Sequence, residues 1–192
     1  MQNEIIIAGF GGQGVLLAGT LIAQAAVEQG LHTTWFPSYG AEMRGGTANS
    51  TVVVSSDEIG SPLAFNPNAL IALNEPSLNK FMSRLAGDAV IIANSSIIPQ
   101  NTEYKVKPYF IPVTDIADKE IKNLKAANTV AVGTLIKALE VQRLNIPERQ
   151  NADEKGLILE SVLSACEKIF SSKPQLIEVN KKAIQAGYDF IK

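Results

Sequence analysis

Short apolar runs that end in glycine or proline alternate with longer stretches of helical composition along most of the chain. Residues 4–8 are apolar and rich in β-branched side chains, as in a buried parallel strand, and residues 13–29 are rich in Ala and Leu and stop at Gly30. The same patterns predict further strands at 32–36, 48–55, 70–73, 89–93 and 105–113, and further helices at 77–85, 128–144, 153–170 and 175–187. This alternation predicts the α/β fold class, with three α/β/α layers and a mainly parallel, Rossmann-like sheet.

The prolines and the chain length predict where strands end and how many domains the chain forms. We expect Pro37 to end the second strand. Pro108 and Pro112 place the last strand at an edge of the sheet, because proline cannot donate to a strand ladder. A length of 192 residues favours one domain, so we expect residues 1–192 to form a single unit whose helical C-terminal part begins at about residue 128.

Charged residues are distributed unevenly along the chain. Residues 1–100 contain 3 basic and 7 acidic residues, whereas residues 101–192 contain 14 basic and 12 acidic residues. No charged residue lies between Ile5 and Val27, although a surface helix normally carries a charged outer face. Two explanations remain open: either the first helix is buried within its own α/β layers, or another chain covers part of this half.

Composition argues against several classes of function. A net charge of −2 and a pI of about 5.5 disfavour nucleic-acid binding, which usually needs a basic face. No apolar run of 18 residues predicts a membrane span and no basic-led signal segment is evident, so we expect no membrane contact and a cytoplasmic location. With one histidine, His32, and one cysteine, Cys166, we expect no metal site.

Some of the remaining residues are assigned to the core. Cys166 lies in an apolar helical stripe, so we expect it to be buried rather than reactive. We also expect Trp35 and Phe36, on the second predicted strand, to be core aromatics.

A glycine-rich motif follows the first predicted strand and precedes the first predicted helix. It reads Gly9-Phe10-Gly11-Gly12-Gln13-Gly14. In this context the glycines let the backbone approach a bound phosphate, and the helix N-terminus supplies N–H donors. The complete dinucleotide fingerprint also needs an acidic residue about 20 positions further on, and residues 32–38 contain none. A free-standing nucleotide-binding module or NAD(P)-linked oxidoreductase is therefore an alternative, as is a structural role in which the glycines only permit close strand–helix packing.

A second glycine-containing segment follows the second predicted strand. Its candidate site residues are Ser38, Tyr39, Glu42, Arg44, Gly45 and Gly46. In a parallel sheet we expect this segment beside the first glycine loop, at the edge where open α/β sheets bind ligands. Arg44 is the only basic residue among the first 79, and it could pair with Glu42 or offer several donors to a phosphate or carboxylate. We expect the two loops to form a binding site, against the alternative of a polar turn that this pair stabilises by itself.

Four segments of the chain resemble the gamma subunit of the 2-oxoacid:ferredoxin oxidoreductases. They are IIIAGFGGQGVLLAG, SYGAEMRGGTANSTVVVS, NEPSLNKF and NTVAVGTLIKAL. The resemblance covers most of the chain up to about Leu144. Within the family it is closest to the branch assigned to 2-oxoglutarate or branched-chain 2-oxoacids.

The resemblance implies a multi-subunit enzyme that converts a 2-oxoacid, in our prediction 2-oxoglutarate, to its acyl-CoA while ferredoxin is reduced. It places thiamine diphosphate, Mg²⁺ and the iron–sulfur clusters on alpha, beta and delta-type (ferredoxin-like) partner subunits. The chain itself has no four-cysteine set and no Gly-Asp-Gly motif for thiamine diphosphate, so we expect no catalytic residue and no cofactor bound by this chain alone.

Because the cofactors are expected on the partner subunits, we expect this chain to contribute residues to a site that it shares with them. We expect residues 9–14 and 38–46 to face the partner subunits and to shape the region where the co-substrate coenzyme A binds. A purely structural scaffold without ligand contact is a third alternative.

Overall fold

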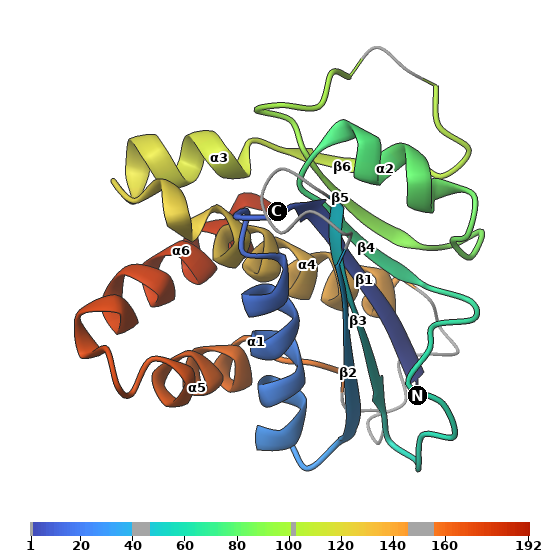
Figure 1. The fold of residues 1–192 in the computed structure, drawn as a ribbon, viewed down its shortest axis with the longest axis horizontal. Coiled ribbons are helices and arrows are strands. Elements are labelled where there is room, and N and C mark those ends of the chain that lie inside the picture. The colour runs from blue at the N-terminus through green and yellow to red at the C-terminus, as the bar shows by residue number, and fades with distance from the viewer. Residues whose placement is uncertain (1, 40–46, 101–102, 146–155) are drawn as a thin grey trace.

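A six-stranded sheet forms the centre of the molecule (Figure 1). The structure is a computed structural model that describes residues 2–39, 47–100, 103–145 and 156–192. The strands are β1 (Gln2–Phe10), β2 (His32–Tyr39), β3 (Thr47–Ser55), β4 (Ala69–Ala72), β5 (Val90–Asn94) and β6 (Tyr109–Ile111). Their order is β2-β3-β1-β4-β5-β6, with β3 antiparallel to both neighbours and the other pairings parallel. Five of these strands therefore share one direction, which confirms the predicted fold class.

The antiparallel strand β3 is the main departure from the expected sheet. It pairs with β1 on one side and β2 on the other, so β2 does not lie beside β1. As the edge strand, β2 continues through Pro37 instead of ending before it, because a proline at a sheet edge costs no ladder hydrogen bond. The edge position also leaves Trp35 40% and Phe36 46% exposed, so the prediction that both belong to the core is wrong.

Helices cover both faces of the sheet. They are α1 (Val15–Glu28), α2 (Glu75–Met82), α3 (Val113–Asp115), α4 (Ala127–Leu144), α5 (Leu159–Ile169) and α6 (Ile177–Phe190), with short turns η1 (Ile116–Glu120), η2 (Leu124–Ala126) and η4 (Pro174–Leu176). α1 and α4 pack on one face, where α5 lies against α1 and α6 against α4, and α2 packs on the other face (Figure 1). Within the described residues, no helix is both long and apolar enough to cross a lipid bilayer.

Local signals explain where α2 begins. The Asn74 side chain accepts a hydrogen bond from the Ser77 backbone N–H at 2.9 Å, which makes Asn74 an N-cap, and a proline occupies the first turn. The helix predicted at 77–85 therefore starts earlier, at Glu75. The helix predicted at 153–170 begins later than expected, at Leu159.

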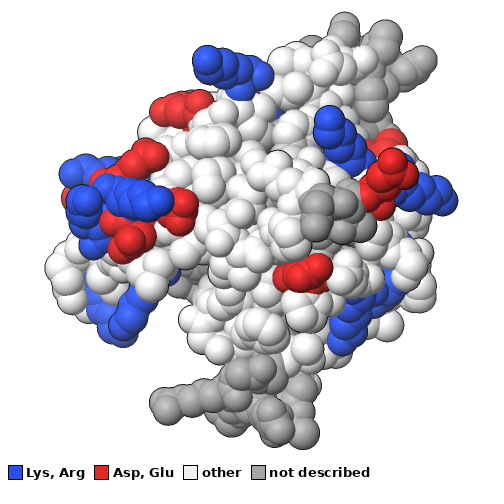
Figure 2. Space-filling model, turned by 90° about the horizontal axis from the view of Figure 1, so that it is seen from above, with Lys and Arg blue, Asp and Glu red and all other residues white. Residues whose placement is uncertain are grey.

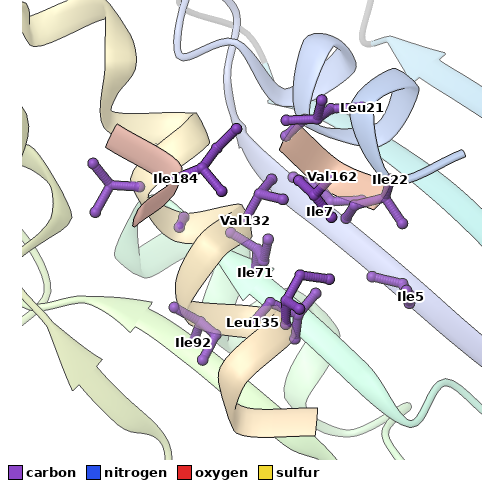
Figure 3. Close-up of a cluster of buried hydrophobic side chains, with 14 of the residues drawn as sticks. Ile5, Ile7, Leu21, Ile22, Ile71, Ile92, Val132, Leu135, Val162 and Ile184 are labelled. Carbon is purple, nitrogen blue, oxygen red and sulfur yellow. The ribbon is translucent and has the colours of Figure 1, made fainter. Parts of the chain in front are cut away.

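The larger of two apolar clusters fills the space between the sheet and the helices α1, α4, α5 and α6. Figure 3 labels ten of its side chains: Ile5, Ile7, Ile71 and Ile92 from the sheet, Leu21 and Ile22 from α1, Val132 and Leu135 from α4, Val162 from α5 and Ile184 from α6. A smaller cluster on the other face joins Leu78 and Phe81 of α2 to Ile6, Leu70 and Ile91. Since each fully buried aliphatic side chain contributes about 1.5–3 kcal/mol, these two clusters hold the layers together.

The helix α1, in which Glu28 at the C-terminal end is the single charged residue, is enclosed largely by this chain itself. Its inner side contacts β1, β2 and β3, and α5 covers its outer side. The packing is close at Gly19, where a Cβ would lie 2.7 Å from the Trp35 indole nitrogen. At the other end of α1, the Lys168 ammonium of α5 lies 2.6 Å from the Glu28 carboxylate. Of the two explanations for the missing charges, burial within its own layers is therefore the one that the structure supports for α1.

Two glycines allow α4 and α6 to approach each other closely. A Cβ on Gly133 would lie 2.8 Å from the carbonyl carbon of Ile184 and closer still to its oxygen. A Cβ on Gly187 would meet the carbonyl group of Val130 in the same way. The Thr134 hydroxyl lies 3.0 Å from the Val130 oxygen and 3.1 Å from the Gly187 oxygen, so the two helices contact each other backbone to backbone.

A tyrosine adds a polar contact to this helix pair. The Tyr188 hydroxyl on α6 donates to the Glu140 carboxylate on α4, and the Lys137 ammonium lies 4.9 Å from the centre of the tyrosine ring. The hydrogen bond to Glu140, followed by burial, raises the pKa of Tyr188 to about 12. Because this pKa is above the ordinary value of 10, the neutral phenol stabilises the folded state below about pH 10, and that contribution is lost as the pH rises towards 12.

We expect Gly133→Ala to destabilise the protein by about 2–3 kcal/mol, because the added methyl group would overlap with the Ile184 carbonyl and force α6 outward. Urea unfolding followed by circular dichroism measures this change. Gly60→Ala is the control, since a Cβ at Gly60 meets nothing within 4 Å, and it should stay within about 1 kcal/mol of the parent. Equal stabilities of the two variants would contradict the close helix contact.

Cys166 is fully buried in the large cluster, as the sequence predicts. Burial raises its pKa from an ordinary 9 to about 11, which lowers the thiolate fraction at pH 8 by about 100-fold. We expect a thiol reagent such as DTNB to modify the native protein at least ~100-fold more slowly than the urea-unfolded protein. Comparable rates in both states, measured at 412 nm, would show that the thiol is accessible.

Candidate functional site

The carboxyl ends of β1 and β4 flank the place where the chain changes sides. From β1 the chain passes through α1 on one face to β2, whereas from β4 it passes through α2 on the other face to β5. Because β1 and β4 are neighbours, the edge between them is a topological switch point, where open α/β sheets bind ligands. The glycine loop of residues 9–14 lies at this edge.

The glycines of this loop have different structural roles. Gly9 is buried in β1, and a Cβ there would lie 2.7 Å from the Gln13 side-chain oxygen. Gly12 and Gly14 have φ values of 102° and 74°, which other residues rarely adopt. A Cβ on Gly14 would meet the Asn128 side chain at 2.6 Å, whereas a Cβ on Gly12 would meet nothing within 4 Å. Gly9 and Gly14 therefore serve close packing, and Gly12 is open to a ligand or a partner.

Gln13 fixes the loop to the sheet. Its Oε1 accepts hydrogen bonds from the backbone N–H of Phe10 at 2.7 Å and from the Asn74 side-chain amide at 3.1 Å. Its Nε2 donates to the carbonyl oxygen of Leu73 at 3.3 Å. One side chain thus joins the end of β1, the end of β4 and the N-terminus of α2.

A second buried amide extends this network to β5. Asn94, at the end of β5, is 2% exposed, and its Nδ2 donates to the Leu73 carbonyl oxygen at 3.4 Å and to the Thr114 hydroxyl oxygen at 2.8 Å. Its Oδ1 accepts from the Ser96 backbone N–H at 3.3 Å. Since a buried amide without partners costs about 1–3 kcal/mol for each group, these bonds hold the three strand ends in one arrangement.

The start of α4 approaches the glycine loop from the opposite side. Asn128, 1% exposed, donates from Nδ2 to the carbonyl oxygen of Gly14 at 3.0 Å. α1 itself starts after Gly14 without a side-chain cap and without an acidic residue in its first turn, and Gly11 is half-buried beside it. The first N–H groups of a helix have no acceptor within the helix, so this end of α1 carries partial positive charge.

Four residues of this arrangement are absent from the sequence-based candidates: Asn74, Asn94, Thr114 and Asn128. The sequence contains a signal for the first two, because both come at the end of an apolar run. Asn94 directly follows the run VIIA, and Asn74 is the second residue after the run ALIA. Asn74 and Asn128 are also the first residues of NEPSLNKF and NTVAVGTLIKAL, two of the segments that carry the family resemblance. Thr114 has no comparable signal, because α3 reaches this edge only through the packing of the sheet.

A cavity of about 290 Å³ opens between the glycine loop and the start of α4. It is lined by Gly12, Gln13, Leu73, Asn94, Ile97, Thr114, Leu124, Lys125 and Ala127. Its walls combine apolar side chains with two amides, one hydroxyl and one ammonium group. Gln13 and Gly12 are thus the predicted site residues that the structure brings to a cavity.

The second predicted loop is only partly within the described residues. Ser38 is half-buried and Tyr39 is 58% exposed at the end of β2, whereas Glu42, Arg44, Gly45 and Gly46 lie outside the described residues. Tyr39 pairs with Ala48 of β3, which in turn pairs with Gly9 of β1. The end of β2 is thus at the expected edge, but β3 separates it from the glycine loop by about 10 Å, or two strand spacings.

Among the described residues, the surface around this edge carries few charges. Figure 2 views the molecule from this side and shows their Lys, Arg, Asp and Glu side chains mostly towards the two flanks of a largely white centre, in which an acidic side chain also lies. Exposed apolar side chains at the edge include Phe10, Tyr39, Ile97 and Leu124. A surface with few charges and several exposed apolar residues is typical of a protein–protein contact.

We expect Gln13→Ala to destabilise the protein by about 1–3 kcal/mol, because it leaves the Phe10 N–H and the Asn74 amide without their acceptor. Urea denaturation provides the measurement. Gln185→Ala, which removes a half-buried glutamine whose side chain bonds to Asp189 at the surface, serves as the control and should change stability by less than about 0.5 kcal/mol. A Gln13 variant as stable as the control would show that the network carries no such role.

Comparison with known proteins gives a consistent set of matches. Residues 4–190 match the family described as pyruvate ferredoxin/flavodoxin oxidoreductase. The chain is 36% identical over 189 residues to ketoisovalerate oxidoreductase subunit VorA of Methanothermobacter marburgensis, an alignment that covers 98% of this chain and 36% of VorA. The chain therefore spans about a third of the length of the VorA relatives that it matches.

Two further relatives have about the same length as this chain. 2-Oxoglutarate synthase subunit KorC of Methanocaldococcus jannaschii is 31% identical, with 100% of this chain and 95% of KorC covered. The crystal structure of pyruvate oxidoreductase subunit PORC from Thermotoga maritima superimposes with a TM-score of 0.75 at 27% identity and covers 98% of this chain and 96% of PORC.

Proposed function

The chain belongs to the pyruvate ferredoxin/flavodoxin oxidoreductase family, and we propose that it acts as the gamma subunit of a 2-oxoacid:ferredoxin oxidoreductase. The observation that carries the proposal is the match over nearly the whole chain to KorC and PORC, which are themselves named as subunits. The carboxyl edge, with its glycine loop, its cavity and exposed apolar side chains such as Phe10 and Leu124, supports a subunit role because it offers a surface for other chains.

In this proposal the complex decarboxylates a 2-oxoacid oxidatively, passes the acyl group to coenzyme A and reduces ferredoxin. Thiamine diphosphate with Mg²⁺ and the iron–sulfur clusters would supply the carbanion and electron-transfer chemistry from partner subunits of alpha, beta and delta type. The single cysteine of this chain does not fit an iron–sulfur cluster, which needs about four thiolates. This cysteine is buried, and within the described residues no three His, Cys, Asp or Glu side chains gather at metal-binding distance.

The chain's own contribution is to form one wall of the site. The Gln13 and Asn94 amides hold the glycine loop and the cavity walls in place, so that a bound group meets donors already in position. Arg44, on the segment 40–46, adds a guanidinium suited to a phosphate or carboxylate. Ordered donors and apolar walls would orient coenzyme A and exclude water from the partner subunits' reaction site.

The proposal also names the 2-oxoacid that the complex oxidises. We propose 2-oxoglutarate, with a branched-chain 2-oxoacid as the close alternative. VorA and KorC carry names for ketoisovalerate and 2-oxoglutarate, and the Thermotoga subunit carries one for pyruvate. All three are 2-oxoacids, so the chemistry of decarboxylation is common to them and the difference lies in the pocket for the side chain.

We expect the purified chain to oxidise no 2-oxoacid by itself, and the complex captured with it from its native host to reduce ferredoxin or a viologen dye in the presence of coenzyme A. Rates with 2-oxoglutarate, 2-oxoisovalerate and pyruvate then rank the substrates. Turnover by the chain alone, or capture of no thiamine diphosphate or iron–sulfur subunit, would refute the proposal. Binding of NAD(P)H to the chain, seen by fluorescence, would favour the nucleotide-binding alternative instead.

We also expect Arg44→Ala to raise the KM for coenzyme A in the assembled complex by about tenfold, since a charge-assisted hydrogen bond to phosphate contributes on the order of 1.5–3 kcal/mol. The KM for the 2-oxoacid should stay within about twofold, and gel filtration should show normal assembly. An unchanged KM for coenzyme A together with normal assembly would exclude a role for Arg44 in coenzyme A binding.

A further inference from the structure

The two edges of the sheet differ in how well they are protected from pairing with another chain. At one edge, β6 has three residues, and Pro108 and Pro112 flank it. Short strands and prolines are common devices that keep a sheet edge from pairing. At the other edge, β2 has eight residues, and within the described residues it pairs only with β3. The edge at β2 is therefore long and open, whereas the edge at β6 is closed.

Pro37 indicates which backbone groups of β2 face the open edge. In an antiparallel pair, only every second residue of a strand bonds to a given neighbour. A proline has no N–H, so it fits into an edge strand when its nitrogen points away from the neighbouring strand. The residues of β2 in phase with Pro37 are Thr33 and Trp35, and their N–H and C=O groups therefore face the open edge. Because Pro37 cannot donate, further pairing along this edge ends before it.

Large apolar side chains are exposed on both faces of this edge. Trp35 lies on the α1 face, close to Gly19, and is 40% exposed. The next residue, Phe36, points to the opposite face and is 46% exposed. Val27, in the last turn of α1, is exposed as well. Exposed aromatic residues on a long edge strand are typical of an edge that another chain covers.

The elements next to this edge carry almost no charge. α1, β2 and β3 together contain no Lys, Arg or Asp and a single Glu, Glu28, which lies 2.6 Å from the ammonium group of Lys168 on α5. Near a two-fold axis every charge meets its own copy, so a contact between identical chains needs an uncharged surface. A contact with a different chain has no such need and usually matches opposite charges. The missing charges thus favour a second copy of this chain as the occupant of the edge.

We infer that β2 pairs in an antiparallel manner with β2 of a second copy of this chain, so that the two sheets become one continuous sheet about a two-fold axis at Thr34. In this register Thr33 lies opposite Trp35 of the other copy, and each bonds to the other through its outward backbone groups. Thr34 lies opposite its own copy, and His32 lies opposite Phe36. Threonine pairs and aromatic pairs are favourable cross-strand contacts.

The helices leave room for this arrangement. α1 contacts β1, β2 and β3, so it lies over the middle strand of the three, β3. β3 and its copy would be three strand spacings apart, or about 14 Å. Two helices that each measure about 10–12 Å across with their side chains fit side by side at this distance. Val27 and Trp35 would then be partly covered between the two α1 helices.

The inference goes beyond the proposed function and does not rest on it. The contact runs along the side of the sheet, whereas the partner subunits of the proposed complex would bind at the carboxyl edge. A chain could therefore pair through β2 and bind other subunits at the same time.

Sedimentation equilibrium of the full chain measures its mass in solution. We expect a species of twice the chain mass of 20.6 kDa at about 50 μM protein. Phe36→Lys should raise the Kd of the dimer at least ~100-fold, because it removes an aromatic contact on each side of the axis. Ile97→Lys is the control: it adds the same charge at a 50% exposed apolar position after β5 and should leave the Kd unchanged. A monomer at about 100 μM, or equal losses in the two variants, would overturn the inference.

A disulfide tests the register, and it keeps the test decisive should Phe36→Lys unfold. Thr34→Cys places two thiols opposite each other at a non-hydrogen-bonded position, where the Cα atoms of antiparallel strands are about 4.5 Å apart and a disulfide can form. We expect a cross-linked dimer on non-reducing gels after mild oxidation. Ser38→Cys, on the same face of β2, should stay monomeric, because its two copies would be more than about 20 Å apart. The native Cys166 is buried and should not react. No cross-link in Thr34→Cys, or equal yields in both variants, would refute the pairing.

The alternative occupant of the edge is a strand of a partner subunit. In that case the purified chain is monomeric and Phe36→Lys lowers the capture of partner subunits from the native host, a result that would rule out the second copy. Conversely, a chain that dimerises through β2 but captures no thiamine diphosphate or iron–sulfur subunit supports this inference and refutes the proposed function.

Discussion

The carbonyl oxygen of Leu73 accepts hydrogen bonds from two side-chain amides, Gln13 on one side and Asn94 on the other. This single acceptor at the end of β4 ties it to the loop after β1 and to the end of β5. Because buried amides must find partners, any displacement of one strand end breaks bonds at the others. The geometry of the carboxyl edge, including the cavity and the position of the glycine loop, depends on this shared oxygen.

The layers around the sheet make that edge available to other molecules. α5 and α6 cover α1 and α4 along their sides, so most of the apolar surface of the first helix is buried by its own chain. The close crossing of α4 and α6 at Gly133 and Gly187 fixes the start of α4, and with it Asn128 and the wall of the cavity. What stays exposed at the carboxyl edge, among the described residues, is a surface with few charges and several apolar side chains around a cavity that polar side chains and Lys125 line, which suits a subunit that completes a site shared with other chains.

The glycine motif illustrates why a motif by itself does not assign a function. In a dinucleotide-binding fold, the glycines, the helix N-terminus and a carboxylate on the adjacent strand act together. Here Gly9 and Gly14 are required for packing against Gln13 and Asn128, and the strand next to β1 is the antiparallel β3. The same loop therefore supports a different arrangement, in which side chains from β5, α3 and η2 replace the missing carboxylate strand as the wall of the cavity.

Local patterns in the sequence were sufficient for the elements and the fold class. The apolar β-branched runs, the Ala-rich helix ending at Gly30 and the strand–helix alternation depend on neighbouring residues, so they could be recognised without the fold. The family resemblance likewise needed only contiguous segments around the glycine motif and residues 38–55. Which strand lies beside β1 depends on pairs from Phe10–Thr47 to Gln2–Ser55, whose residues lie far apart in the sequence. The edge position of Trp35, the continuation through Pro37 and the separation of the two loops therefore became evident only in the tertiary structure. The same holds for Asn94, Thr114 and Lys125: each is an ordinary polar residue along the chain, and only the packing of β5, α3 and η2 against the glycine loop brings the three to one cavity.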